Sequence, residues 1–362
     1  MSKKILITGG AGFIGSNFVR YLLKEEPETI IVNLDALTYA GSTENLKDLP
    51  DPSRHTFVQG DICDRAAVDS LLRDFQVDTV VHFAAETHVD RSIYGPAEFI
   101  QTNVVGTLTL LEAVRSYWLD EKAIPKDRAR FHHISTDEVF GSLAPDEPAF
   151  TESTPYSPNS PYAASKAASD HLVRAYYHTY GLPMTITNCT NNYGPYQFPE
   201  KLIPLMILNA LSGRPLPIYG DGRQVRDWVY VEDHCEAVKV VLDRGVPGET
   251  YNVGGRNQPA NIEVVEELCS ILDELLPESP YTPHDSLIEF VADRPGHDRR
   301  YDMDISKIER ELGWHPRQTL ETGLLNTAIW YIKNREWVEA ARQQGDYQSW
   351  LVRNYARREE QV

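Results

Sequence analysis

The 362-residue sequence predicts an α/β fold, in which a doubly wound parallel sheet carries a second, smaller and loop-rich domain. Three observations predict it. Short apolar runs alternate with amphipathic stretches through the first half, a glycine-rich turn follows the first apolar run, and prolines and glycines become frequent from about residue 194. Because alternating strands and helices pack as βαβ units, we expect the first half to form a parallel sheet with right-handed crossovers.

Six apolar runs in the first half have the length and β-branched content of buried strands. Helical patterns lie between them, and the last helix has a clear start signal, because Ser160 suits the N-cap and Pro161 the first helical position. The predicted strands are 4–8, 29–35, 55–61, 79–85, 130–135 and 183–190, and the predicted helices are about 13–25, 64–75, 97–118 and 161–180.

The composition changes after about residue 194, where prolines and glycines become frequent in segments such as "GPYQFPEKLIP" and "SGRPLPIYGDG". Short helical patterns lie between such segments, at 202–212, 262–276 and 320–334. This part is too rich in apolar residues to be a linker. The stretch "VRDWVYVEDHCEAVKVVLD" is expected to return to the first domain. The predicted division is therefore 1–193 with 225–256 for the first domain, and 194–224 with 257–362 for the second.

Composition excludes several classes of partner. The net charge of −18 argues against nucleic acid or an anionic membrane surface, although a local cluster of Arg and Lys could still hold a small anionic ligand. The apolar run in "MSKKILITGG" is too short for a signal peptide or a membrane span, and no HExxH-like spacing predicts a metal site. We expect a cytoplasmic protein, since no CxxC pair occurs among its cysteines, Cys63, Cys189, Cys235 and Cys269.

The segment "ITGGAGFIGSNF" follows the first strand and opens a helix, which is typical of a Rossmann-type dinucleotide site. Its glycines permit a tight turn, close approach of a pyrophosphate and helix–strand packing, and the helix N-terminus offers N–H groups to the anion. Asp35 ends the second strand, where a carboxylate binds ribose hydroxyls and repels a 2′-phosphate, so NAD is favoured over NADP. The predicted cofactor-binding residues are Gly9, Gly12, Phe13, Ile14, Gly15, Asp35, Asp61, Ile62, Ala84, Tyr162 and Lys166. Asp61 and Ile62, at the end of the third strand, are expected to reach the adenine.

Tyr162 and Lys166 in "SPYAASKAASDH" lie four residues apart, hence on one face of the predicted helix. A neighbouring ammonium lowers the pKa of a phenol, so Tyr162 could take a proton from an alcohol as hydride leaves for NAD. Lys166 could also hold the nicotinamide ribose. The alternative is a surface pair on a solvated helix face, which the glycine fingerprint and the order along the chain disfavour.

The doublet Asp137-Glu138 in "HHISTDEVFG" follows the fifth predicted strand. Two adjacent acids could form a solvated turn or a helix cap. They could also work as a general acid and a general base, since two close carboxyls in a partly desolvated site can share one proton. Which of them holds the proton depends on surroundings that the sequence leaves open.

These motifs, with "LDALTYAG", "HFAAETHVDRSI", "NNYGPYQFPEKLIP", "YGDGRQVRDWVYVEDH" and "DRPGHDRRY", cover nearly the whole chain. The sequence resembles the extended short-chain dehydrogenases/reductases that act on nucleotide sugars, and within them the 4,6-dehydratases of dTDP-glucose. The resemblance implies a redox-neutral cycle with NAD: oxidation at carbon 4, loss of water across carbons 5 and 6, and return of hydride to carbon 6. It assigns catalysis to Thr136, Asp137, Glu138, Tyr162 and Lys166, with Glu138 as the base and Asp137 as the acid.

The same resemblance implies contacts to the nucleotide half of the substrate. Arg226 and Arg294 suit a diphosphate because a guanidinium is a planar, permanently charged fork, although ordinary surface ion pairs are the alternative. The roles of His88 and Asp90 stay open. The implied substrate-binding residues are Thr87, Asn192, Lys201, Leu202, Pro217, Tyr219, Arg226, Asn261, Arg294 and His297. The family also implies a homodimer through a four-helix bundle, for which the helices at 97–118 and 161–180 are the candidates.

Four other functions compete. A nucleotide-sugar 4-epimerase would share the glycine loop, Tyr162 and Lys166 but needs no acid–base pair for elimination, so the Asp-Glu doublet argues against it. GDP-mannose dehydratases typically prefer NADP and lack this doublet. A UDP-glucose 4,6-dehydratase shares the doublet and stays open. A non-catalytic binding protein on this fold would be expected to lose the tyrosine, the lysine or the acids, and all are present.

Overall fold

The protein, seen in a computed structural model that describes residues 3–293, 296–345, 347 and 349, is built on a seven-stranded sheet. The strand order is β10-β6-β5-β4-β1-β2-β3, and every neighbouring pair runs parallel. The strands are β1 (Lys4–Thr8), β2 (Ile30–Asp35), β3 (His55–Gln59), β4 (Thr79–His82), β5 (Arg130–Thr136), β6 (Met184–Cys189) and β10 (Thr250–Val253). The predicted fold class is confirmed, and the six predicted strands are present: β1 has the predicted bounds, β5 is one residue longer, and the other four are shorter. Strand β10 was not predicted.

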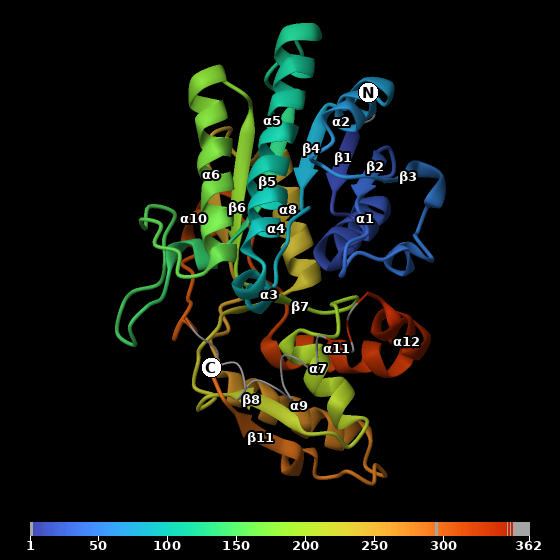
Figure 1. The fold of residues 1–362 in the computed structure, drawn as a ribbon, viewed down its shortest axis with the longest axis vertical. Coiled ribbons are helices and arrows are strands. Elements are labelled where there is room, and N and C mark those ends of the chain that lie inside the picture. The colour runs from blue at the N-terminus through green and yellow to red at the C-terminus, as the bar shows by residue number, and fades with distance from the viewer. Residues whose placement is uncertain (1–2, 294–295, 346, 348, 350–362) are drawn as a thin grey trace.

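Helices cover both faces of this sheet (Figure 1). Because successive strand residues point to opposite faces, Ile5 and Ile7 pack in the core with α1 and α8, while Leu6 packs in the core with α2, α5 and α6. The helices are α1 (Phe13–Glu25), α2 (Arg65–Asp74), α5 (Thr107–Arg115), α6 (Pro161–Tyr180) and α8 (Val231–Arg244). Short 3₁₀ turns lie at η1 (Thr43–Leu46), η2 (Pro52–Arg54) and η6 (His284–Leu287).

The single helix predicted at 97–118 is wrong in detail. After α3 (Val89–Tyr94), the chain forms α4 (Pro96–Phe99), a π-helix η3 (Ile100–Gly106), α5, and a second π-helix η4 (Ser116–Glu121). A π-helix closes i→i+5 bonds and is rare, so a helical apolar pattern predicts one α-helix instead. The η3 turn places Asn103 where its amide donates to the Glu86 carbonyl at 3.0 Å and to the Ser165 hydroxyl at 2.8 Å.

A smaller unit lies beyond the carboxyl ends of the main strands (Figure 1). It contains two parallel strand pairs and four helices around a separate apolar core. The pairs are β7 (Asn191–Tyr193) with β9 (Trp228–Tyr230), and β8 (Leu216–Tyr219) with β11 (Ile288–Val291). The helices are α7 (Leu202–Ala210), α9 (Asn261–Leu275), α11 (Leu320–Lys333) and α12 (Arg335–Gln343). The three short helices predicted here are therefore confirmed.

The predicted domain division remains a proposal, which the packing of β7, β9 and α10 (Ser306–Leu312) modifies. Tyr193 of β7 and Trp228 and Tyr230 of β9 pack in the core of the smaller unit. Tyr301, Ile308 and Trp314 belong to the same apolar core as α1 and α8, not to the core of the smaller unit. We therefore propose to count residues 301–314 with the larger domain, and β7 and β9 with the smaller unit.

Helix α12 contacts the glycine-rich loop through one intermediate residue. The Trp337 indole of α12 donates to Oδ1 of Asn45 at 2.7 Å, and the Asn45 amide donates to the Ala11 carbonyl at 2.8 Å. The side-chain amide of Gln344, just after α12, donates to the Gly41 carbonyl. The smaller unit thus supports the turn that follows β1.

None of the helices in the described part of the chain combines the length and apolar character needed to cross a bilayer. Within those same residues, no group of three or more His, Cys, Asp or Glu side chains has the arrangement of a metal site.

Candidate active site

The turn after β1 is possible only with glycine at its critical positions. Gly9 has φ +73°, and a Cβ there would lie 2.6 Å from the Ala84 backbone nitrogen. A Cβ at Gly15 would lie 2.2 Å from the Gly9 carbonyl oxygen. Gly12 forms the N-cap of α1, so the first N–H groups of that helix are available to an anion.

Asp35 ends β2 and is buried beside this turn. Its two carboxylate oxygens accept the backbone N–H groups of Ala11 and Leu37, both at 2.8 Å. Burial raises the pKa of Asp35, and these hydrogen bonds work in the opposite direction. Asp61 lies beyond the end of β3 at Gln59, so its predicted place within the strand is wrong; it accepts the Cys63 N–H at 2.8 Å.

One cavity of about 320 Å³ brings the predicted cofactor and catalytic residues together. It runs from the glycine turn, past the ends of β2 and β3, to the ends of β5 and β6. Its lining includes every predicted cofactor residue and all five predicted catalytic residues: Gly9, Gly12, Phe13, Ile14, Gly15, Asp35, Asp61, Ile62, Ala84, Thr136, Asp137, Glu138, Tyr162 and Lys166.

Strand β5 ends at Thr136, which caps the 3₁₀ turn η5 (Asp137–Phe140). The Thr136 hydroxyl accepts the Glu138 N–H at 3.3 Å and donates to Oδ1 of Asp137 at 3.2 Å. The cap is therefore the threonine, and the two acids follow it as the first residues of the turn. A capping role does not account for either carboxylate.

Asp137 is buried, with a relative exposure of 2%. Burial raises its pKa well above the ordinary value, the negative charge of Glu138 raises it further, and Arg226 lowers it. Its Oδ2 is buried without a hydrogen-bond partner among the described residues. These surroundings favour the protonated form of Asp137.

Tyr162 and Lys166 are both buried, so the alternative of a solvated surface pair is wrong. Helix α6 begins as predicted, with the Ser160 hydroxyl accepting the Ala163 N–H at 3.1 Å. Burial raises the pKa of Tyr162, Glu138 raises it further, and a hydrogen bond with Thr136 lowers it. The predicted lowering of this pKa by the lysine is therefore not what the structure shows. The Lys166 ammonium donates to the Ile134 carbonyl at 2.7 Å.

The residues implied for the nucleotide half gather in an adjoining cavity between the two units. Arg226 is buried rather than a surface cation: its guanidinium donates to the carbonyls of Val225 and Asp298, both at 2.8 Å, and lies 4.3 Å above the Tyr301 ring. Asn192 lines the first cavity, Thr87 and Lys201 line both, and Arg294 lies outside the described residues. The second cavity is also lined by Leu202, Pro217, Tyr219, Arg226, Asn261 and His297.

Several lining residues were not assigned from the sequence. His88, whose Nε2 lies 3.7 Å from Oε1 of Glu200, and Asp90, which accepts the Tyr219 hydroxyl at 3.3 Å, connect the loop after β4 to the smaller unit. Both residues belong to the motif "HFAAETHVDRSI", and that motif was the sequence signal that could have assigned them to the site. The unassigned residues of the two cavities include Thr38, Tyr39, Gly41, Glu86, Gln197, Phe198, His88, Asp90, Glu200, Trp228 and Tyr301.

Comparison with known proteins identifies the family. A family model described as GDP-mannose 4,6 dehydratase matches residues 6–327. The dTDP-glucose 4,6-dehydratase of Salmonella typhimurium is 56% identical, over 98% of this chain and 100% of its own length. The chain belongs to the dTDP-glucose 4,6-dehydratase family. This confirms the resemblance inferred from the sequence.

Solved structures place the fold in the same family. The Streptomyces venezuelae member, crystallised with NAD and TYD bound, is 49% identical with a TM-score of 0.83, covering 93% of this chain and 99% of that one. UDP-glucose 4-epimerase from Thermotoga maritima is 29% identical with a TM-score of 0.80, covering 92% of this chain and 99% of its own. Dehydratase-family members and epimerases share the fold, so the site must distinguish them.

Proposed function

We propose that the protein catalyses the NAD-dependent dehydration of dTDP-glucose to dTDP-4-keto-6-deoxyglucose. It is an enzyme of the hydro-lyase class. The observation that carries the proposal is the buried Asp137 beside Glu138, in the same cavity as Tyr162 and Lys166. An epimerase requires only the tyrosine and the lysine, whereas elimination of water requires both an acid and a base.

The residues around the glycine turn fit NAD. The bare N-terminus of α1 suits a pyrophosphate, and the buried carboxylate of Asp35 suits ribose hydroxyls but repels a 2′-phosphate. Lys166 lines the same cavity, and in this proposal its ammonium holds the second ribose. Bound NAD supplies the acceptor and donor of hydride at the sugar, and NAD-bound members of the family agree with this cofactor.

In the first step Tyr162 acts as its phenolate, which takes the proton of the 4-hydroxyl while hydride leaves carbon 4. Burial and Glu138 oppose the phenolate, and the hydrogen bond from Thr136 favours it. Thr136, whose hydroxyl lies beside both Tyr162 and Asp137, holds the 4-oxygen. The new ketone acidifies the hydrogen on carbon 5. Glu138 then removes that hydrogen as a proton, and Asp137 donates its proton to the departing 6-hydroxyl, which leaves as water.

In the last step hydride adds to carbon 6 and Glu138 returns its proton to carbon 5, which restores the base. After one cycle Tyr162 has gained one proton and Asp137 has lost one. A single proton transfer from the phenol to the carboxylate, directly or through solvent, therefore restores both side chains to their starting states. Each of these acid–base roles is typically worth about 10²–10⁴ in rate.

We propose a homodimer that forms through α5 and α6 with the π-helix η3. These elements pack side by side on one edge of the molecule (Figure 1). Large apolar side chains are exposed along them and along α3: Ile93, Tyr94, Ile100, Val105, Leu108 and Tyr180. A second copy would remove this surface from water. In light scattering, Leu108→Glu should reduce the mass to that of a monomer, whereas Val246→Glu, at an exposed apolar residue elsewhere, should not.

We also propose a cytoplasmic location. All four cysteines are free thiols, and three of them are buried. A reducing compartment suits a protein with no disulfide among these residues.

The proposed function is tested by turnover of dTDP-glucose, UDP-glucose and GDP-mannose, with products identified by mass. We expect loss of one water from dTDP-glucose without net accumulation of NADH. Preferred turnover of UDP-glucose would reassign the nucleotide. Formation of the galactose epimer with no loss of mass would contradict the dehydratase assignment.

A further inference from the structure

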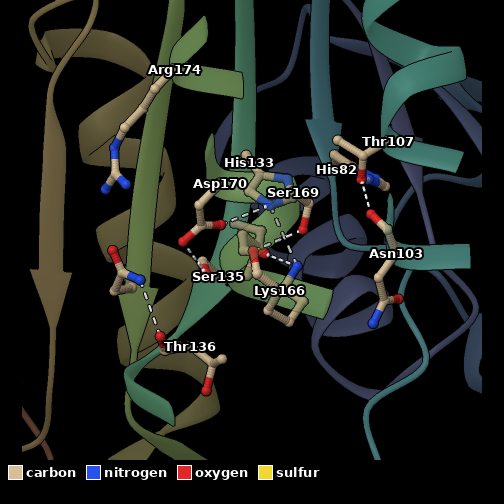
Figure 2. A network of polar contacts seen from close by, with 12 residues as sticks. His82, Asn103, Thr107, His133, Ser135, Thr136, Lys166, Ser169, Asp170 and Arg174 are labelled. Atoms are coloured by element: carbon tan, nitrogen blue, oxygen red, sulfur yellow. Dashed lines mark hydrogen bonds and ion pairs between the residues drawn. The ribbon is translucent and has the colours of Figure 1, made fainter. Parts of the chain in front are cut away.

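A chain of buried polar groups connects Lys166 to Asp170 through His133 (Figure 2). The Nε2 atom of His133 on β5 lies 3.5 Å from the Lys166 ammonium and 3.2 Å from Oδ1 of Asp170. His133 and Asp170 are fully buried and Lys166 is 4% exposed. Tyr162, Lys166 and Asp170 follow one another at four-residue spacing on α6, so the helix aligns all three.

Three further groups surround the Asp170 carboxylate. Its Oδ2 accepts the Ser135 hydroxyl at 2.7 Å and the Tyr156 hydroxyl at 2.8 Å. The Arg174 guanidinium in turn donates to the Tyr156 oxygen at 2.8 Å. Burial alone raises the pKa of Asp170, but His133, Lys166 and Ser135 lower it, and the net direction is down. Asp170 is therefore a carboxylate in the folded protein.

On the strands behind Lys166, the other titratable groups are neutral at physiological pH, whereas Glu138 on the cavity side is a second proposed anion. Burial and the lysine lower the pKa of His133 to about 4, and burial lowers that of His82 on β4 well below its usual range. On β6, burial raises the pKa of the Cys189 thiol to about 12. From η3 and α5, Asn103 and Thr107 add only uncharged groups. On the cavity side lie Tyr162, Asp137 and Glu138.

We propose that Asp170 is a positioning residue, whose carboxylate stabilises the charged form of Lys166 across the neutral imidazole of His133. A buried ammonium without an opposite charge tends to lose its proton, because burial penalises the charged form by up to several pKa units. Burial does lower the pKa of Lys166, and Asp170 is the largest influence that raises it again. The Ile134 carbonyl fixes the direction of the ammonium, while Asp170 maintains its charge.

The proposal rests on the proposed function, in which Lys166 acts with Tyr162 in hydride transfer. The first test is the pH profile of NADH formation in a single turnover of the NAD-loaded enzyme with dTDP-glucose. In Asp170→Asn the loss of the negative charge lowers the pKa of Lys166, so the alkaline limb should move to lower pH by about one unit or more. Asp170→Glu, which keeps the charge, should return the limb toward its wild-type position.

Tyr156→Phe is the matched control, because it removes one hydrogen bond to Asp170 but leaves the carboxylate ionised above neutral pH. Its alkaline limb should stay in place. A uniform loss of rate in Asp170→Asn with an unmoved limb would indicate a purely structural role and overturn the proposal. Failure of the wild-type protein to dehydrate dTDP-glucose would instead contradict the proposed function, which distinguishes the two.

A second measurement does not depend on turnover. Titration of the wild-type protein labelled with ¹³C at lysine Cε follows the charge of Lys166 directly by NMR, with its signal assigned by its loss in Lys166→Met. We expect Lys166 to stay protonated at pH 8 in the wild-type protein and to titrate at lower pH in Asp170→Asn. A neutral Lys166 at pH 7 in the wild-type protein would overturn the proposal even if Asp170→Asn did not fold.

Discussion

The Thr136 hydroxyl donates to Oδ1 of Asp137 at 3.2 Å, which leaves the second carboxyl oxygen of Asp137 as the one that can present a proton to the cavity. The residue that caps the turn therefore also orients the proposed acid. Burial and the adjacent Glu138 raise the pKa of Asp137, so the acid and the base are assigned by their surroundings rather than by their ordinary strengths.

Asp137→Asn should abolish the proton donor while keeping the shape of the side chain. We expect kcat for dehydration to fall by about 10²–10⁴, with NADH still formed in a single turnover. The matched control is Asp146→Asn, at an exposed loop aspartate, which should leave kcat unchanged. In the wild-type enzyme, the elimination step should weaken as pH rises through the raised pKa of Asp137, because only the protonated form is active. An elimination rate that grows with pH would contradict the assignment.

Glu138→Gln removes the proposed base. Reduction of bound NAD should persist, but exchange of the carbon 5 hydrogen with deuterated water should stop, because no group removes that proton. Mass spectrometry of recovered sugar measures the exchange. Deuterium at carbon 5 at the wild-type rate would show that another base acts there. The same variant should also lower the pKa of Asp137, since Glu138 is the largest influence after burial.

Tyr162→Phe should suppress hydride transfer itself, by about 10²–10⁴ in the single-turnover rate of NADH formation. The phenyl ring keeps the packing of Tyr162 against Phe99, whose ring centroid lies 6.2 Å away, so thermal stability should change little. Tyr281→Phe, at an exposed tyrosine that lines neither cavity, serves as the control. Unchanged NADH formation in Tyr162→Phe would remove this residue from the proposed mechanism.

Asp35→Asn tests the preference for NAD over NADP. The carboxylate accepts two backbone N–H groups, which the amide can satisfy only in part. Hydrogen bonds to charged groups are worth about 1.5–3 kcal/mol, so NAD affinity should fall roughly 10- to 100-fold while that for NADP rises relative to it. Calorimetric titration of both cofactors measures the ratio. An unchanged ratio would mean that specificity is determined elsewhere.

Much of this architecture could be predicted from the sequence, because glycine spacing, strand alternation and helix capping are local signals. Gly9, Asp35, Tyr162 and Lys166 all lie where those signals put them, around one cavity. Other features depend on tertiary contacts. The π-helices η3 and η4 have no sequence signature of their own, and α10 joins the larger core only through packing that residue spacing does not predict.

The electrostatics of the site were harder to predict. The lysine near Tyr162 in the sequence predicted a lowered pKa of the phenol, but burial and Glu138 raise the pKa of Tyr162. The spacing in "YAASKAASD" puts Asp170 on the same helix face as Tyr162 and Lys166. Its contacts with His133, Ser135 and Tyr156 could not be predicted, because those residues lie outside this helix. The protonated state of Asp137 likewise required burial, which no local pattern reports.

Two hydrogen bonds, from Trp337 to Asn45 and from Asn45 to Ala11, join α12 to the turn that follows the first strand. We expect this link to couple cofactor exchange to local unfolding, because the turn can move freely only when α12 detaches. The NAD dissociation rate should then rise in Trp337→Phe in parallel with faster hydrogen exchange in α12. Helix α12 would thereby determine how long one NAD molecule stays bound through successive turnovers.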